Sequence, residues 1–287
     1  MEYAHLKAFT YEGTGGNSAG VVLIDDRISD VEMQEKAAEI GFSETAYIKK
    51  INGDKFSFRF YTPTCEVDLC GHATIASFYY LALKEIIKPS EEKWNGIQTT
   101  KAGNFNVEVT YKDKKPNIVC MQQGQPEYFG EVKDLKGIGD SLNIQSYFLK
   151  LDSYNIYPSI ISTGLRDLLI PVRSREVLNS IKPDFDKVRN LSLINQVVGY
   201  HLFTVENDNV YTRNFAPAVG IEEECATGTA NGALIYLLSK EGIMNESIII
   251  QGEAMGEKSI IYAKTVNFMN KYIIKIGGSA ELIKEVE

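Results

Sequence analysis

Two stretches of the chain, RFYTPTCEVDLCGHAT at residues 59–74 and RNFAPAVGIEEECATGT at residues 213–229, share one order of residue types. Each runs from an arginine through an aromatic residue, a proline and an acidic residue to a cysteine, small residues and a threonine. Arg59 and Arg213 are 154 positions apart, and Cys70 and Cys225 are 155 apart, so the two spacings agree to one residue. This agreement indicates an internal duplication, and a period of this length is typical of two homologous domains rather than a solenoid.

The flanking sequence predicts the elements that each stretch joins. Alternating apolar residues predict strands at residues 3–9, 19–24, 45–49, 56–62 and 105–111. Ser29 and Glu32 have the spacing of a capping box, and Gly41 marks the end of the helix that follows. Two further helices begin after Gly71 and Gly228 and are apolar on nearly every side, so both should be buried. The sequence therefore predicts an α+β protein with two cores.

At 287 residues the chain is long enough for about two domains. We expect an N-terminal half at residues 1–125 and a C-terminal half at residues 126–287, because the stretch GQPEYFG near residues 124–130 supplies glycine and proline. The two halves should be related by a pseudo-twofold axis and share one cleft. The sequence leaves open whether the last strand returns to the first domain.

The composition favours a small-molecule partner. The chain has 30 Lys and Arg against 38 Asp and Glu, and the resulting net charge of -8 argues against binding to nucleic acid or to an anionic membrane. The first residues lack a secretory pattern, so we expect a cytoplasmic protein. The four cysteines form no CxxC pair and no nucleotide-binding motif occurs, so the sequence predicts no disulfide scaffold, no metal site and no cofactor.

The segments CGHAT and CATGT are expected to be turns from a strand into a helix. Such a turn presents unpaired backbone N–H groups and the positive end of the helix dipole, which together bind anions. If both turns face one gap, that gap would hold a carboxylate or a developing enolate. The same field would lower the pKa of Cys70 and Cys225 and make them candidate thiolates. The alternative is that each cysteine is a small buried hydrophobe.

Three other side chains are candidates for the chemistry. Glu44, flanked by Phe42 and Tyr47, would have its pKa raised towards neutral by an apolar setting, which suits a general acid or base, although it could also be a solvated cap. His72 could orient a substrate oxygen, relay a proton, or bond a turn carbonyl. Glu224 is one of three consecutive acids and by itself indicates only surface charge. The glycine-rich stretch at residues 14–20 is a possible substrate-lining turn.

Together these motifs resemble the PhzF (phenazine biosynthesis-like) family, which has the diaminopimelate epimerase-like fold. The matching elements run nearly end to end in family order: AFTYEGTGGNSAGVVL, MQEKAAEIGFSETAYI, RFYTPTCEVDLCGHATIAS, ISTGLRDLLIPV, RNFAPAVGIEEECATGTANGAL, IIIQGEAMG and IGGSAE. The resemblance implies two similar domains, each a mostly antiparallel sheet rolled around a central helix. It also implies a cofactor-free acid–base isomerase, usually a homodimer.

The resemblance assigns roles to residues of this chain. Glu44, in the SET motif, would move the proton as the main catalytic residue, and Glu224 would be the acid of the second turn. Substrate contacts are implied for the remaining residues of the two turns and for the glycine-rich stretch: Gly71, His72, Ala73, Gly228, Thr229 and Asn17. The chain departs from the usual Asp-Pro of the second turn, where it has Glu224 and Cys225. A longer acid and a thiol at this place indicate a different substrate.

Three functions follow from the sequence. The preferred one is a cofactor-independent isomerase or epimerase that moves a proton on a small carboxylate substrate, with Glu44 as proton carrier. The second is a two-cysteine amino-acid racemase or epimerase, in which Cys70 and Cys225 transfer the proton. The third is a noncatalytic protein that binds small acids.

Overall fold

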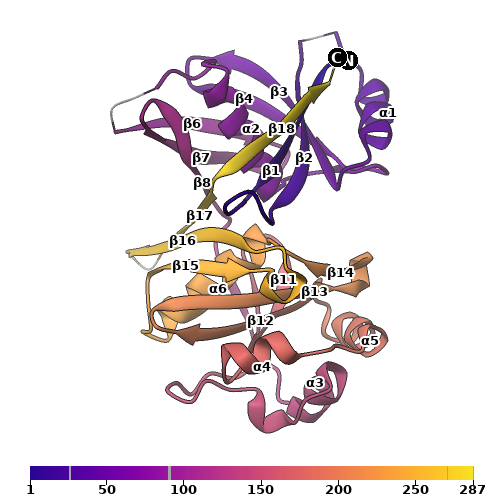
Figure 1. The fold of residues 1–287 in the computed structure, drawn as a ribbon, viewed down its shortest axis with the longest axis vertical. Coiled ribbons are helices and arrows are strands. Elements are labelled where there is room, and N and C mark those ends of the chain that lie inside the picture. The colour runs from indigo at the N-terminus through magenta and orange to yellow at the C-terminus, as the bar shows by residue number, and fades with distance from the viewer. Residues whose placement is uncertain (26, 90–91, 270, 287) are drawn as a thin grey trace. The chain divides into compact units, whose positions relative to one another are not determined.

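The computed structural model describes residues 1–25, 27–89, 92–269 and 271–286. The chain forms two compact units, a first unit of Met1–Gln122 with Gly277–Glu287 and a second unit of Gln123–Ile276. The end of the chain belongs to the first unit, where β18 (Ala280–Val286) pairs antiparallel with β1 (Tyr3–Ala8). Figure 1 shows these two strands side by side, in yellow and indigo.

The first unit is one sheet with the strand order β18, β1, β2, β3, β4, β6, β7, β8, and β5 pairs with β4. All neighbours are antiparallel except the parallel pairs β2–β3 and β4–β6. The strands are β2 (Asn17–Leu23), β3 (Glu44–Asn52), β4 (Lys55–Tyr61), β5 (Glu66–Val67), β6 (Lys93–Thr100), β7 (Gly103–Lys112) and β8 (Lys115–Gln122). Strands from both ends of this sheet contact α2 (Gly71–Leu83), so the sheet curves around that helix.

Aromatic side chains attach α2 to the sheet. In β4 every second side chain faces inwards, and Phe56, Phe58 and Phe60 are fully buried. The ring of Phe78 in α2 lies 5.8 Å from the ring of Phe56 and 5.1 Å from that of Phe58, measured between centroids. Burying each such side chain stabilises the fold by about 1.5–3 kcal/mol. This packing fixes where the first turn of α2 lies.

The helix between β2 and β3 forms as the sequence predicts. α1 (Asp30–Ile40) begins with a capping box between Ser29 and Glu32 and ends at Gly41, whose φ of 73° is in the left-handed region. Glycine adopts this conformation without a steric penalty, so the helix can stop there. The chain then enters β3 at Glu44, and the cap thereby positions the residue on which the predicted chemistry depends.

The second unit has the strand order β9, β10, β11, β12, β13, β15, β16, and β14 pairs with β13. Its strands are β9 (Glu127–Glu131), β10 (Ser159–Ser162), β11 (Arg166–Pro171), β12 (Gly199–Glu206), β13 (Asn209–Ala216), β14 (Ile221–Glu224), β15 (Glu246–Gln251) and β16 (Ser259–Phe268), and β17 (Lys271–Gly278) follows. Its helices are α3 (Leu135–Leu142), α4 (Arg175–Ser180), α5 (Phe185–Asn195) and α6 (Gly228–Lys240), with short 3-10 turns η1 (Ser146–Phe148), η2 (Pro217–Val219) and η3 (Glu253–Met255). α6 contacts β10, β11, β15 and β16.

The two units repeat one topology. In the second unit the pairs β11–β12 and β13–β15 are parallel and the other neighbours are antiparallel, as in the first unit. The helices α2 and α6 are both 13 residues long. These matches confirm the α+β class with mostly antiparallel strands, and the repeated topology agrees with the predicted duplication. In the described part of the chain, no helix is both long and apolar enough to cross a lipid bilayer.

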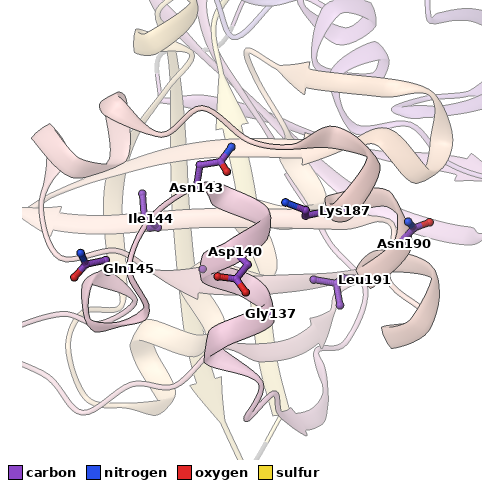
Figure 2. A pocket seen from close by; sticks show the side chains of 9 residues that line it. Gly137, Asp140, Asn143, Ile144, Gln145, Lys187, Asn190 and Leu191 are labelled. Atoms are coloured by element: carbon purple, nitrogen blue, oxygen red, sulfur yellow. The ribbon is translucent and has the colours of Figure 1, made fainter.

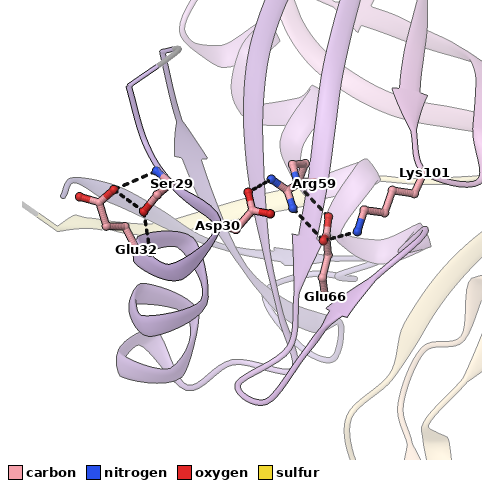
Figure 3. A network of polar contacts seen from close by, with 6 residues as sticks. All are labelled: Ser29, Asp30, Glu32, Arg59, Glu66 and Lys101. Carbon is pink, nitrogen blue, oxygen red and sulfur yellow. Dashed lines mark hydrogen bonds and ion pairs between the residues drawn. The ribbon is translucent and has the colours of Figure 1, made fainter.

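An ion pair between an arginine and a glutamate recurs in both units. In the first, the Arg59 guanidinium donates to both carboxylate oxygens of Glu66, and it also contacts Asp30 (Figure 3). In the second, Arg213 donates in the same two-bond manner to Glu223. The arginines are 154 positions apart, whereas the glutamates are 157 apart. The second unit therefore contains three additional residues between these points, where η2 lies.

This insertion corrects the equivalence drawn from the two cysteines. The helices begin at Gly71 and Gly228, 157 positions apart, and their N-cap residues are Cys70 and Thr227. Cys225 therefore corresponds in register to Asp68, not to Cys70. The cysteines are 155 positions apart, whereas the starts of the two helices are 157 positions apart because of the inserted residues. The two cysteines therefore differ by two positions in structural register, and their matching place in the motif is a coincidence.

Candidate active site

Three polar side chains of the first unit meet at the start of α2. Glu44 is the first residue of β3, Cys70 is the N-cap of α2, and His72 is in its first turn. Glu44 Oε2 lies 3.1 Å from His72 Nε2, and Cys70 Sγ lies 3.6 Å from His72 Nδ1. The side chains of His72 and Glu44 are only 12% and 21% exposed. The structure therefore brings together three of the residues that the sequence singled out.

The charges in this cluster stabilise one another. Burial opposes ionisation of Glu44, but the charge and hydrogen bonding of His72, with contacts from Ser43 and Cys70, outweigh it and lower the pKa of Glu44. Burial also opposes ionisation of His72, yet the interactions with Cys70 and with the Glu44 carboxylate raise its pKa well above 6.5. At neutral pH the pair is consequently a carboxylate beside an imidazolium, and the carboxylate can accept a proton.

Two electrostatic expectations from the sequence are wrong. The pKa of Glu44 was expected to rise in an apolar setting, but it falls because a buried cation lies beside it. The pKa values of Cys70 and Cys225 were expected to fall at a helix N-terminus, but burial raises both. For Cys70 the adjacent charge of Glu44 adds to the effect. Desolvation and neighbouring anions thus outweigh the contacts that lower the pKa of these thiols.

Side chains that the sequence analysis missed surround the cluster. Ser43 Oγ lies 3.3 Å from His72 Nε2, and the Ser43 hydroxyl also donates to the carbonyl oxygen of Ser18. His5 stacks on Phe42 at 4.2 Å between ring centroids, and its Nε2 lies 3.0 Å from Ser18 Oγ. These contacts join β1, β2 and the segment before β3. They follow from strand pairing between distant segments, which no local motif reveals.

The helices α2 and α6 differ from the other α-helices in how they begin. Side chains of the N-cap residues accept a backbone N–H bond at the starts of α1, α3, α4 and α5: Ser29, Asp134, Ser174 and Asp184. Among the described residues, neither Cys70 nor Thr227 makes such a bond with its side chain. The first-turn N–H groups of α2 and α6 thus lack a side-chain cap, as expected for groups that bind an anion from outside the helix.

The first-turn residues predicted to bind substrate occupy equivalent places in the two helices. Gly71 and Gly228 are the first residues of α2 and α6, and His72 and Thr229 are the second. A Cβ atom at Gly71 would meet only Met121 Sδ, at 3.9 Å, so the turn is open there. Gly228 is buried.

The other predicted contacts lie at the edges of these turns. Ala73 is fully buried in α2, so its backbone rather than its side chain is available for recognition. The carbonyl oxygen of Thr229 accepts a bond from Thr163 Oγ1 at 3.0 Å. Asn17 begins β2, two residues before Ala19, the register partner of Glu44 in β3. The roles of these residues in substrate binding stay predictions.

The acid of the second turn is held by its neighbours. Glu224 ends β14, and its Oε2 accepts a hydrogen bond from the Thr227 hydroxyl at 2.8 Å. Its carbonyl oxygen accepts a bond from Gln251 Nε2, also at 2.8 Å. Glu224 is half-buried and is therefore not the plain surface charge that three consecutive acids suggest. Cys225 follows it and is also half-buried.

A second acid in the same unit escaped the sequence analysis. Asp167 of β11 is only 3% exposed, and burial, with the charge of Glu224 as a further cause, raises its pKa to about 8. Asp167 is therefore mostly protonated at neutral pH. In the sequence Asp167 is a single acid within ISTGLRDLLIPV. The run of apolar residues after it was the one signal that could have indicated its burial.

A surface hollow elsewhere in the second unit contains none of these residues. It has a volume of about 580 Å³ and lies beside α3 and α5, with Asp140, Asn143 and Lys187 among its lining side chains (Figure 2). Its charged groups extend from the helix surfaces and make no cluster with a candidate base. The chemistry therefore points to the turns before α2 and α6 and not to this hollow.

Glu44, Cys70 and His72 also have the residue types of a metal site. Their potential ligand atoms all lie within 4.8 Å of one another. However, the contact from Glu44 to His72 has ion-pair length, and the contact from Cys70 to His72 has hydrogen-bond length for sulfur. An ion pair of this kind is also suited to proton transfer.

Comparison with known proteins agrees with this description of the fold. A hydroxyproline epimerase from Agrobacterium vitis superposes with a TM-score of 0.65 over 100% of this chain and 91% of its own, at 12% sequence identity. A PhzF-family phenazine biosynthesis protein of Bacillus anthracis superposes with a TM-score of 0.85 over 100% of this chain and 98% of its own, at 26% identity. The chain thus has the fold shared by these epimerases and PhzF proteins.

Sequence comparison gives the family. The family model described as phenazine biosynthesis-like protein matches residues 6–285. An uncharacterized isomerase of Clostridium acetobutylicum is 35% identical over an alignment of 298 positions, gaps included, which covers 98% of this chain and 96% of the relative. The chain belongs to the PhzF family, as the sequence resemblance predicted. The name of the relative agrees with the predicted class of enzyme, an isomerase.

Proposed function

We propose that the protein is a cofactor-independent isomerase that moves a proton alpha or vinylogous to a carboxylate, with Glu44 as the proton carrier. The observation that carries this proposal is the buried contact of 3.1 Å between Glu44 Oε2 and His72 Nε2. It keeps a carboxylate ionised inside the protein, next to a group that can stabilise negative charge. Two relatives are named as uncharacterized isomerases, and these names support the same class.

The proposed reaction has two proton transfers. Glu44 accepts the proton from carbon, so the C–H bond breaks, an O–H bond forms, and the electron pair spreads into the conjugated carboxylate of the substrate. The His72 imidazolium and the first-turn N–H groups of α2 stabilise that charge. Glu44 then returns the proton, either to another carbon of the conjugated system or to the same carbon. We also propose three residues at the start of α6 as substrate-binding residues, as the family resemblance implies: Glu224, Gly228 and Thr229.

The alternative with two catalytic thiols has less support. Burial raises the pKa of Cys70 and of Cys225, which disfavours the thiolates that such a mechanism needs. In addition, Cys225 corresponds in register to Asp68, so the two cysteines are not equivalent parts of the duplicated turn. Glu44 therefore carries the proposal.

Deuterium incorporation tests the proposal directly. The protein is incubated in D₂O with a panel of amino acids and unsaturated cyclic carboxylic acids, and NMR shows which carbon gains deuterium. We expect incorporation alpha or vinylogous to the carboxylate of at least one acid. Inversion of configuration that depends on both cysteines would favour the two-thiol racemase instead. Binding of an acid without any incorporation would favour a noncatalytic protein.

A further inference from the structure

A directed series of hydrogen bonds begins at a buried histidine of the second unit. His201 of β12 and Asn231 of α6 are fully buried, and Asn214 of β13 is 2% exposed. The Asn214 amide nitrogen lies 3.2 Å from His201 Nδ1, and His201 Nε2 lies 2.9 Å from Asn231 Oδ1. An amide NH₂ can only donate, so Nδ1 accepts and the proton of the neutral ring is on Nε2.

The series continues to the carboxylate of Glu224. Asn231 Nδ2 donates to Gln251 Oε1 at 2.9 Å and to the Thr227 carbonyl oxygen at 2.7 Å. Gln251 Nε2 donates to Thr227 Oγ1 at 3.0 Å, and this hydroxyl in turn donates to Glu224 Oε2 at 2.8 Å. Each amide offers its oxygen to the preceding member and its nitrogen to the next. We call the series Asn214, His201, Asn231, Gln251 and Thr227 the positioning chain.

The first unit shows that the fold does not require the positioning chain. There the equivalent turn is supported by Gln98, which donates to Thr74 Oγ1, and by Thr74, which donates to the Cys70 carbonyl oxygen. In register, the place of His201 is taken by Ala46 and that of Asn214 by Phe60. A turn with the same helix register thus forms with an apolar pair at these positions.

Four of the five members of the positioning chain are buried and Thr227 is half-buried, whereas two buried polar side chains, Gln98 and Thr74, support the first turn. Burying a polar group costs free energy unless it is hydrogen-bonded. Additional buried polar groups are therefore not needed to stabilise a turn that two residues can support. The extra members lead in one direction, and their last bond ends on a half-buried carboxylate. Their contribution beyond folding is consequently to fix that carboxylate.

We propose that the positioning chain holds the Glu224 carboxylate in one orientation towards the substrate, so that His201, Asn214, Asn231, Gln251 and Thr227 are positioning residues of the reaction. This inference rests on the proposed function, in which the second turn contacts the substrate. Glu224 then acts as a fixed acceptor, while Glu44 moves the proton. Preorganised groups of this kind contribute to catalysis because they need no rearrangement in the transition state.

The first experiment needs no substrate. Carbon-13 NMR of the Glu224 carboxyl group is followed against pH in the full-length protein, in Thr227→Val and in Asn214→Leu. We expect its titration midpoint to rise in both variants, more in Thr227→Val, because a carboxylate that loses a donor is easier to protonate. Thr204→Val, a buried substitution of the same kind on β12, is the matched control and should leave the midpoint unchanged. Asp167, whose charge state affects Glu224, is present in all variants.

Nitrogen-15 NMR of His201 checks the origin of the series. In the wild type we expect a neutral ring protonated at Nε2, and in Asn214→Leu a change of tautomer or a mixture of the two. If the series had only a structural role, these substitutions would lower the stability of the protein. They would not change the titration midpoint of Glu224 at the other end of the series. If the Glu224 midpoint is the same in wild type, Thr227→Val and Asn214→Leu, the positioning chain is refuted.

The second experiment uses the acid that exchanges deuterium in the panel. Thr227→Val should lower kcat/KM about 10- to 100-fold, mainly through kcat, because it removes a hydrogen bond to a charged group. Thr227→Ser keeps the hydroxyl and should restore most of the activity. In the background of Glu224→Gln, Thr227→Val should have little further effect, because the two changes act through one group.

The outcomes separate this inference from the proposed function. If no acid exchanges deuterium but the Glu224 midpoint moves as expected, the positioning chain stands and the proposed reaction fails. If exchange occurs and the effects of Thr227→Val and Glu224→Gln multiply independently, the positioning role is refuted and the proposed reaction stands. Loss of activity in Thr227→Ser as large as in Thr227→Val would also refute it.

Discussion

The turns before α2 and α6 share a backbone and differ in chemistry. Both precede helices of 13 residues, and in both the fourth helical residue donates to the carbonyl oxygen of the N-cap, from Thr74 to Cys70 and from Asn231 to Thr227. The first turn carries an ion pair with a candidate base, whereas the second carries a neutral series of amides and a hydroxyl. The duplication has thus preserved the turn and its missing side-chain cap, while the proposed proton carrier is found in one copy.

The largest expected effect tests that division of roles. Glu44→Gln removes the carboxylate that we propose as the proton acceptor and should lower the rate of deuterium exchange by about 10²–10⁴-fold. The amide has the same shape and can still lie beside His72, so the variant should fold. Exchange is measured by NMR, and folding by circular dichroism.

Glu39→Gln is the control for this substitution. Glu39 is an exposed carboxylate of α1 that pairs with Lys36, so its loss should not change the exchange rate. Full turnover by Glu44→Gln would remove Glu44 from the mechanism and would make the two turns functionally alike.

The next largest effect is on stability and concerns the ion pair that occurs in both units. The Arg213 side chain is 6% exposed and bonds Glu223 and the carbonyl oxygens of Leu178 and Ile181. Arg213→Ala leaves these groups buried without partners and should cost about 3–5 kcal/mol of unfolding free energy. Arg59 is 25% exposed, and Arg59→Ala should cost about 1 kcal/mol.

Urea denaturation measures both variants. Equal losses would mean that the greater burial of the pair in the second unit has no energetic consequence. Arg213→Lys serves as a control, because it keeps the charge but lacks the planar group that makes two parallel bonds.

Local patterns predicted much of the fold and part of the site. The capping box at Ser29 and the glycine at Gly41 placed α1, and the repeated motif placed α2 and α6. These features depend on residues close together in the chain. The partners of Glu44 could not be derived in this way, because its pKa depends on His72, which is brought to it by the pairing of β3 with β4 and by the packing of α2.

The positioning chain could not be predicted from the sequence at all. Its members come from β12, β13, β15 and α6, and as single residues in the sequence they have no distinguishing spacing. The wrong equivalence of Cys70 and Cys225 has a similar cause. Matching letters determine a register only if no residues are inserted, and η2 with its three additional residues is visible only in three dimensions.

Asp167 gives a pH-dependent difference between the units. Its pKa is raised from 3.8 to about 8 in the folded protein, so the folded state keeps a proton that the unfolded state has released. This contribution to stability is complete below about pH 4 and is lost as pH rises towards 8. Asp167→Asn remains neutral, so between pH 5 and pH 8.5 the wild type should lose about 4 kcal/mol more than the variant. Urea denaturation at the two pH values measures this, and parallel stability curves would contradict it.

The smallest expected effect distinguishes the two proton carriers. Cys70→Ser and Cys225→Ser should each change the exchange rate by less than about tenfold, because serine keeps a hydrogen-bonding group and one weakened bond is worth only about 1 kcal/mol. Cys65→Ser, at the exposed cysteine, is the control for the substitution itself. A two-thiol mechanism predicts instead that each of the first two variants loses all exchange and that substrate protects Cys70 and Cys225 from alkylation. That result would assign the proton transfer to the cysteines instead of Glu44. Each turn would then supply one catalytic thiol, although the two cysteines differ in structural register.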